Sequence, residues 1–319
     1  MSLIEVVDYI DADVAYLLGL ITARGRISES GGIRQITVEF PYQSLQVEGT
    51  SGSYDADTSI RLGLQQIQER LLELTGADIT ITPKDNSITL VLRFFRNTMV
   101  WRNILMHTKD RTGYEHFLVP QIFFSPDVPM DWKREYIKGF ADVAGNIRHA
   151  NRYVNGAHRV RLDILNYQTN WEMPVQLCTV LEEHLAVPVQ LITWGHPNMG
   201  RNFREHQLNI FAAPFGEIGF SLPHKQNILE EFIEHDEEHY PTLDYSPCVG
   251  RKKLRTKKPR DKRESDDRLD DRLKGKHFNA YWQICKKLGC PRTPSAIQGE
   301  LWEFDEHEAL EEVIEEDEV

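Results

Sequence analysis

Apolar and polar positions repeat with two different periods along the chain, and the changes between them mark the predicted elements. Apolar residues recur at helical spacing over residues 14–22 and 60–74. Between and after these helices the pattern alternates residue by residue, as in strands with one buried face. The stretch ISESGGIRQITVEF predicts a strand pair that turns at Gly31-Gly32, and ADITITP and SITLVLRFF predict two further strands.

The same order of elements returns in the second half of the chain. The pattern predicts a helix at 132–140, strands in GNIRHANRYV and HRVRLDILN, a helix near 173–184, strands PVQLITW and HQLNIFA, and a final helix at 225–235. We therefore predict an internal duplication of one αββαββα unit. The predicted regions are two halves at 1–120 and 121–240, a charged linker at 241–275, a small helical appendix at 276–302 and an acidic tail at 303–319.

Two similar stretches, AYLLGLITARG at 15–25 and EYIKGFADVAG at 135–145, each predict a helix that ends on a glycine. Gly19 and Ala23 lie four apart on one helix face, and Gly139 offers a similar small surface, so the two helices can pack closely. Both stretches resemble the LAGLIDADG motif, which names a family of homing endonucleases. The resemblance covers roughly residues 10–235 and implies an α+β fold, a pseudo-twofold duplicated αββαββα unit with a saddle-shaped antiparallel sheet.

The alternating strands divide their side chains between two sheet faces. We expect one face to pack against the helices through Ile36, Val38, Leu90, Leu92, Val160, Leu162 and Ile164. The resemblance implies that the polar face contacts the major groove of duplex DNA, where Arg pairs with guanine and Gln or Asn with adenine. An ordinary solvated sheet face explains the same alternation. The predicted DNA-binding residues are Arg24, Arg26, Thr37, Thr80, Lys84, Arg93, Arg148, Arg152, Arg159, Arg161, Gln207 and Asn209.

The eighth motif position bears on catalysis. In the family an acidic residue at this position ends each helix, and the two carboxylates hold divalent metal for phosphodiester cleavage. Here the two positions are Arg24 and Ala144, and neither is a ligand of that kind. The resemblance with both acids replaced predicts a binding fold without catalytic residues, metal or cofactor, in which Arg24 could reach a phosphate. Asp142, Asp163 or Glu39 could instead supply acids, although Asp142 also suits a helix-end hydrogen-bonding role.

Charge and cysteine content bear on the partners, the cellular compartment and the metal binding that can be expected of the protein. The formal net charge of −12 argues against nonspecific attraction to nucleic acid, although nine Lys or Arg fall in residues 251–263 and the C-terminus is acidic. We expect both charged blocks to be solvated tails. Few cysteines, no basic leader and no long apolar run predict a cytoplasmic protein without a membrane segment. Free thiols are expected, since Cys248, His277, Cys285 and Cys290 match a zinc site poorly.

The sequence thus favours one function and leaves two alternatives. The favoured function is a monomeric, sequence-specific double-stranded DNA-binding protein with a degenerate, non-cleaving LAGLIDADG fold. It would act as a regulator or as the recognition subunit of a restriction or phage-defence system, with residues 241–319 open to a protein partner. The alternatives are a metal-dependent endonuclease that uses non-motif acids and a protein-interaction scaffold. The 21 basic and 32 acidic residues of 1–250 favour the scaffold.

Overall fold

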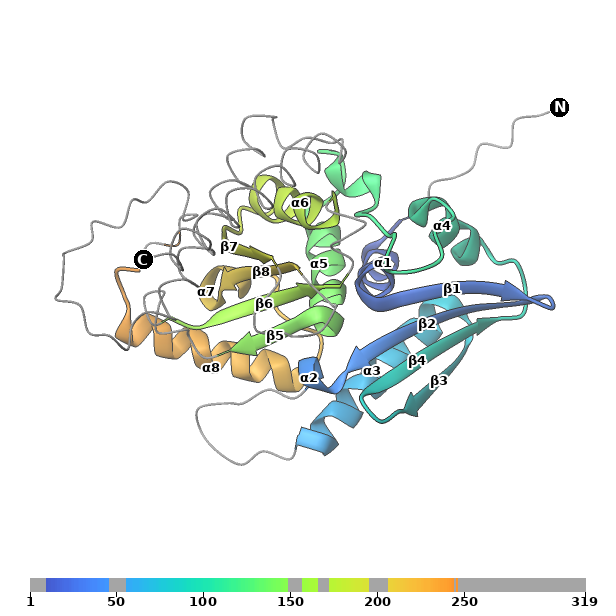
Figure 1. Cartoon of the computed structure of the whole chain (residues 1–319), viewed down its shortest axis with the longest axis horizontal. Coiled ribbons are helices and arrows are strands. Elements are labelled where there is room, and N and C mark those ends of the chain that lie inside the picture. The colour runs from blue at the N-terminus through green and yellow to red at the C-terminus, as the bar shows by residue number, and fades with distance from the viewer. Residues whose placement is uncertain are drawn as a thin grey trace, which may run out of the picture.

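Two α+β halves lie side by side, with helices α1 (Ala12–Arg24) and α5 (Met130–Ala144) between them (Figure 1). The structure is a computed structural model, and it describes residues 10–45, 56–148, 157–165, 172–194, 206–243 and 245. Within this part of the chain, no helix is long and apolar enough to cross a membrane. The predicted linker, appendix and acidic tail fall almost wholly outside the described residues, and the predicted half boundaries remain a prediction.

The first half contains an antiparallel sheet with the order β1-β2-β4-β3, formed by β1 (Gly25–Ser30), β2 (Ile33–Pro41), β3 (Asp78–Pro83) and β4 (Ser87–Phe94). The turn between β1 and β2 is the predicted one, and Gly31 and Gly32 have φ values of 59° and 80°. Such left-handed values are easy for glycine and suit a tight hairpin. The helices of this half are α2 (Tyr42–Leu45), α3 (Ala56–Thr75) and α4 (Met99–Thr108).

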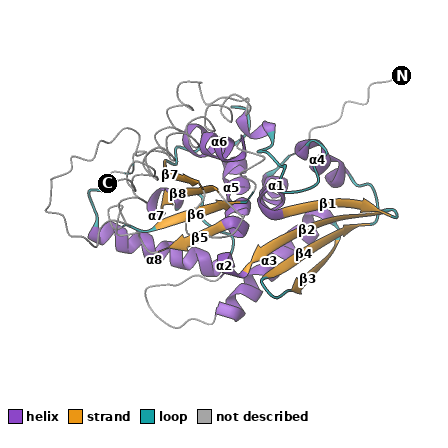
Figure 2. Ribbon diagram, viewed as in Figure 1, coloured by secondary structure: helices purple, strands orange, loops and turns teal. Residues whose placement is uncertain are grey.

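The second half repeats this topology. Its sheet has the order β5-β6-β8-β7, from β5 (Gly145–Arg148), β6 (Arg159–Ile164), β7 (Val189–Trp194) and β8 (His206–Phe211). Figure 2 shows the strands gathered into two separate sheets. The α+β class and the antiparallel sheets confirm the predicted fold class. The helices are α6 (Glu172–Thr179), which continues as a π-helical turn (Val180–His184), α7 (Ala212–Phe215) and α8 (Pro223–His239); a 3-10 turn (Gln121–Phe124) precedes α5.

The apolar sheet faces form the core as the alternation predicts. All seven expected inward residues are at most 3% exposed, namely Ile36, Val38, Leu90, Leu92, Val160, Leu162 and Ile164. Helix α1 is buried along its whole length from Val14 to Ala23, because it is covered by both halves. This is why its sequence is apolar on every side rather than amphipathic.

The two central helices pack against each other at a pair of glycines. A Cβ atom added to Gly19 would lie well under 3.0 Å from the main-chain oxygen of Tyr136, and one added to Gly139 would approach the oxygen of Tyr16 equally closely. Main chain therefore contacts main chain at this point, which no residue other than glycine allows without moving a helix. Gly139 follows Gly19 by 120 positions, the offset of the two motif-like stretches.

Candidate nucleic-acid interface

Two tyrosines link the central helices in a nearly symmetric way. The hydroxyl of Tyr16 on α1 donates to Asp142 Oδ2 on α5 at 2.7 Å, and the hydroxyl of Tyr136 on α5 lies 3.0 Å from Thr22 Oγ1 on α1. Each tyrosine therefore contacts the sixth motif residue of the other helix. The two contacts share a tyrosine but differ in its partner. Tyr16 contacts the carboxylate of Asp142, whereas Tyr136 contacts the hydroxyl of Thr22.

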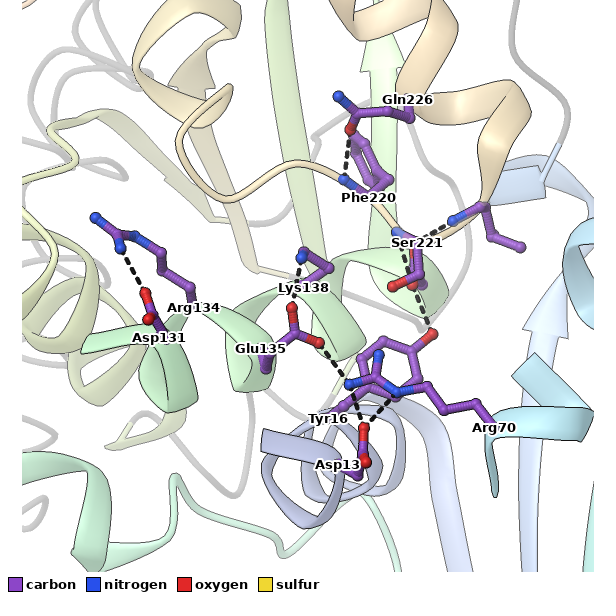
Figure 3. A network of polar contacts seen from close by, with 12 residues as sticks. Asp13, Tyr16, Arg70, Asp131, Arg134, Glu135, Lys138, Phe220, Ser221 and Gln226 are labelled. Carbon is purple, nitrogen blue, oxygen red and sulfur yellow. Dashed lines mark hydrogen bonds and ion pairs between the residues drawn. The ribbon is translucent and has the colours of Figure 1, made fainter. Parts of the chain in front are cut away.

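Asp142 is buried and held by donors from three directions. Besides Tyr16, it accepts from the main-chain amide of Ser221 at 3.1 Å and from that of Leu222 at 3.3 Å, in the segment that enters α8 (Figure 3). Burial raises the pKa of Asp142, while the charge of Lys225 and these hydrogen bonds oppose the rise. Its carboxylate is 0% exposed, so it fixes a loop and is not presented to solvent.

Lys225 is buried at the end of α5. Its Nζ donates to the main-chain oxygens of Asp142 and Gly145, each at 2.8 Å, and lies 3.4 Å from that of Ala141. The carbonyl of Asp142 lies in the last turn of α5, where carbonyls lack intrahelical donors and the helix dipole favours a cation. Burial lowers the pKa of Lys225 to about 7, against the raising effect of Asp142 and Asp163. An amine of this chain thus caps the end of the second motif helix.

The two eighth motif positions differ in exposure. Ala144 is 0% exposed and has no polar side-chain atom, whereas Arg24 is half-buried at the last position of α1. The foot of the second helix is closed to solvent by its own packing. Only the foot of the first helix therefore presents a charged side chain at this motif position.

Arg70 of α3 joins the two central helices on one side. Its guanidinium contacts Asp13 of α1 at 2.7 Å and Glu135 of α5 at 2.8 Å, and it lies 4.1 Å from the ring centre of Tyr16 (Figure 3). Both ion pairs raise the pKa of Arg70 against the effect of its burial. The sequence analysis did not identify Arg70, because apolar periodicity carries no sign that one arginine contacts both motif helices.

The polar face of the first sheet carries the predicted residues in rows. Arg26, Thr37 and Thr80 lie in one row across the strands, because Arg26 pairs with Thr37 and both Thr37 and Thr80 pair with Val91. The next row places Arg93 between Gln35 and Asp78. Lys84 is exposed in the turn after β3, at the end of this sheet.

The arginines of this first face are already paired with carboxylates. Arg26 forms an ion pair with Glu115 and lies 5.1 Å from the ring centre of Tyr114. Arg93 lies 3.4 Å from Asp78 on the neighbouring strand. Ion pairs as exposed as these contribute little to stability, so the arginines can exchange a carboxylate for another anion.

The polar face of the second sheet carries a tighter cluster. Arg161 contacts Asp163 through Nε at 2.7 Å and through Nη2 at 3.0 Å, and Asn146 donates to the same carboxylate. Asn209 lies opposite Arg161 and Gln207 lies opposite Asp163, so the structure brings these polar groups together. Asn146 was missed by the sequence reasoning, although its place beside the motif glycine in a strand was a usable signal.

Arg159 lies on the predicted face but is not open to solvent. Its residue is 6% exposed, and its guanidinium lies 4.6 Å from the ring centre of Phe211, which packs against Tyr245 at 5.4 Å. The alternation predicted a solvated arginine, and this exposure was wrong because the guanidinium packs on the ring of Phe211 on the neighbouring strand β8. Arg148 pairs with Arg159 through the main chain, and Arg152 lies outside the described residues.

Comparisons with known proteins give structural neighbours alone. No protein-family model matches the chain, and no curated protein sequence matches it. The homing endonuclease I-DmoI in complex with DNA and Ca is 15% identical with a TM-score of 0.41, over 69% of this chain and 97% of that one. Full-length WhiA from Thermotoga maritima is 13% identical with a TM-score of 0.40, over 92% of this chain and 80% of that one.

The N-terminal LAGLIDADG domain of WhiA is also similar, at 13% identity and a TM-score of 0.35, over 71% of this chain and 84% of that one. The structural neighbours are LAGLIDADG proteins. This is the family that the two glycine-ended stretches resemble. In LAGLIDADG terms, the sixth motif positions meet the tyrosines of the opposite helix, and the eighth positions hold Arg24 and a buried Ala144.

Proposed function

We propose that the protein binds double-stranded DNA in a sequence-specific manner and does not cut it. The support comes from the two polar sheet faces, which offer Arg, Gln, Asn and Thr side chains in defined rows. Antiparallel strands can enter a major groove, and these side chains match the donors and acceptors of base edges there. The neighbour I-DmoI has been solved in complex with DNA, which is consistent with this use of the fold.

The ion pairs on the polar face of the first sheet can be replaced by contacts with DNA phosphates. Arg26 and Arg93 each face a carboxylate that is at least one third exposed, and a phosphate can replace it with a bidentate contact. The displaced Glu115 and Asp78 return to water at little cost. Arginines that are already held in place lose little side-chain freedom on binding, which favours affinity, and their phosphate contacts make that affinity salt-dependent.

The proposal that the protein does not cleave DNA is supported by the C-terminal end of α5. A two-metal site needs oxygen ligands, and at this place the chain has a buried Ala144 with the amine of Lys225 capping the helix end. The contacts of this amine already occupy the carbonyls of Asp142 and Gly145, and in its protonated form the amine also repels a divalent ion. This single arrangement carries the proposal of a non-cleaving protein.

The alternative acids are poorly placed for a nuclease. Asp142 is buried among Tyr16 and main-chain amides, and Asp163 is held by Arg161 and Asn146. Glu39 is exposed but accepts from Ser87 Oγ at 2.7 Å. These carboxylates are committed to internal hydrogen bonds, so the endonuclease alternative lacks a ready pair of metal ligands in the described residues.

The cellular role extends this proposal. A non-cutting binder acts as a monomeric regulator or as the recognition subunit of a restriction or phage-defence system in the cytoplasm. Residues 241–319 would then provide the contact with a protein partner. The basic stretch within them suits an acidic surface, and the acidic end suits a basic one.

Selection from a random duplex library with the full chain tests the proposal. We expect enrichment of one sequence, and incubation of that duplex with Mg²⁺ or Mn²⁺ should leave both strands intact. A library that yields no enriched sequence would contradict specific binding and favour the scaffold alternative. Reproducible scission that is lost on Glu39→Gln would move the protein to the nuclease alternative.

A further inference from the structure

Two histidines and an aspartate meet where β6 begins and α8 ends. His158 precedes β6, while His235 and Asp236 lie in the last turns of α8, and their candidate ligand atoms all lie within 4.8 Å of one another. This cluster is separate from the helix feet described above. Two imidazoles and a carboxylate are a donor set that suits zinc.

Asp236 is the centre of the cluster. Its Oδ2 accepts from the main-chain amide of His158 at 2.7 Å, which fixes the carboxylate, and its Oδ1 lies 2.6 Å from His158 Nδ1. Asp236 and His158 are 1% and 4% exposed. The ring of His158 also stacks on Phe232 with centres 3.9 Å apart, so its orientation is set by packing.

His235 completes the cluster. Its Nδ1 is buried, has no hydrogen-bond partner among the described residues, and lies 3.5 Å from Asp236 Oδ1. The ring of His239, one helical turn later, stacks on that of His235 at 4.0 Å and an angle of 10°. A buried nitrogen without a hydrogen-bond partner is costly, and a metal ion bound there would satisfy it.

The surrounding charge favours a cation. From Gln226 to the end of α8 the helix carries six carboxylates and no lysine or arginine. These are Glu230, Glu231, Glu234, Asp236, Glu237 and Glu238. Such an excess lowers the free energy of a bound divalent ion.

We propose that His158, His235 and Asp236 bind one Zn²⁺ ion, with water in the fourth position. Zinc bonds of about 2.0–2.2 Å in a tetrahedron separate neighbouring ligand atoms by roughly 3.3 Å. The 3.5 Å between His235 Nδ1 and Asp236 Oδ1 already fits this spacing, and the His158 pair opens by less than about 1 Å. The proton on His158 Nδ1 leaves as the metal binds.

The ion would join two distant parts of the second half. His158 and Asp236 are 78 residues apart, and the metal would replace the hydrogen bond between His158 Nδ1 and Asp236 Oδ1 by one coordinate bond from His158 and two from α8. Ions that bind only the folded chain stabilise it by an amount that grows with the logarithm of their concentration above Kd. The link would also hold α8 against the strand that carries Arg161, so it orients one edge of the polar face.

Titration of the chelator-treated full chain with Zn²⁺ by calorimetry tests this site. We expect one ion per chain, a higher thermal midpoint with Zn²⁺, and visible absorption of four-coordinate Co²⁺. His235→Ala is the informative variant, because His235 is partly exposed and makes no hydrogen bond that folding needs. We expect it to weaken Zn²⁺ binding more than tenfold. His116→Ala, at an exposed histidine elsewhere, is the matched control and should bind as the unaltered chain does.

Two outcomes overturn the site. The first is the lack of stoichiometric Zn²⁺ binding, which leaves His158 and Asp236 as a hydrogen-bonded tether of α8. The second is Zn²⁺ binding that survives His235→Ala and is lost when Cys285 and Cys290 are both replaced by serine. That result would locate the ion at the cysteines of the C-terminal region.

Discussion

Lys225 Nζ donates to the main-chain oxygen of Gly145 at 2.8 Å, at the residue where the second motif helix passes into its strand. The two residues are 80 positions apart, and they bring the start of α8 against the end of α5. A side chain therefore supplies the positive charge that this helix end attracts.

Replacement of this lysine should destabilise the fold strongly. Lys225→Met removes the donor for the carbonyls of Asp142 and Gly145 and leaves the Asp142 carboxylate buried without a nearby cation. We expect the free energy of unfolding to fall by roughly 3 kcal/mol. Urea unfolding followed by circular dichroism measures it. Lys138→Met leaves Glu135 paired with Arg70, so it should change the free energy of unfolding by less than about 1 kcal/mol; equal losses would contradict the capping role.

The same lysine should make stability depend on pH. Its pKa is about 7 in the folded chain and returns to the ordinary value of 10.5 on unfolding, so between these values the unfolded chain binds the additional proton. Stability then rises with pH through this window, because a charge that burial disfavours is lost from the folded state. The difference in unfolding free energy between the unaltered chain and Lys225→Met, measured from pH 6 to 10, should change in that direction. A difference independent of pH would show that Lys225 keeps an ordinary pKa.

The two tyrosines should differ when their hydroxyls are removed. Tyr16→Phe takes a donor from a buried carboxylate, whereas after Tyr136→Phe the Thr22 hydroxyl still donates to the oxygen of Leu18 at 2.8 Å. We expect losses of about 2 kcal/mol and about 1 kcal/mol, in that order. The pair of variants is matched in volume, so chemical denaturation compares them directly. The reverse order would mean that Asp142 is protonated in the folded chain.

Gly19→Ala should disrupt the contact between the central helices. Its Cβ would meet main-chain atoms of Tyr136 and Phe140, which cannot move separately from their helix. We expect a loss of at least about 3 kcal/mol or failure to fold. Gly63→Ala on α3 is the comparison, since its Cβ would first meet Leu222 Cδ2 at 2.9 Å, a side-chain atom that can shift, and it should cost clearly less than Gly19→Ala. A stable Gly19→Ala chain would rule out the close approach.

Salt dependence should distinguish open arginines from the covered one. Arg26→Ala together with Arg93→Ala should lower the salt dependence of duplex affinity by about 0.9 logarithmic units per lost phosphate contact. Arg159→Ala removes a guanidinium packed on Phe211 and should lower stability with little change in that slope. Arg134→Ala, on the outer side of α5, is the control. An unchanged slope in the double variant would remove the first sheet from the interface.

The features that the sequence predicted correctly are those that depend on local periodicity, namely the strands and their buried faces. The alternation of Ile36 and Val38 with Thr37 gave the correct sheet face, because a strand has only two sides. The helix at α4 was missed, since its stability comes from tertiary packing such as that of Trp101 on Phe94, with ring centres 5.4 Å apart. The cover over Arg159 and the cap by Lys225 were also not predictable, because both are made by residues distant in the chain.

The unequal partners of Tyr16 and Tyr136 have a consequence for assembly. Two first halves placed together would bring only Thr22 hydroxyls to the tyrosines, and two second halves would bury two Asp142 carboxylates beside one another's helices. Neither homodimer reproduces the mixed contact of the intact chain. The two duplicated halves are therefore complementary to each other and not to themselves. We expect that either half, produced alone, would not assemble into a substitute for the intact chain.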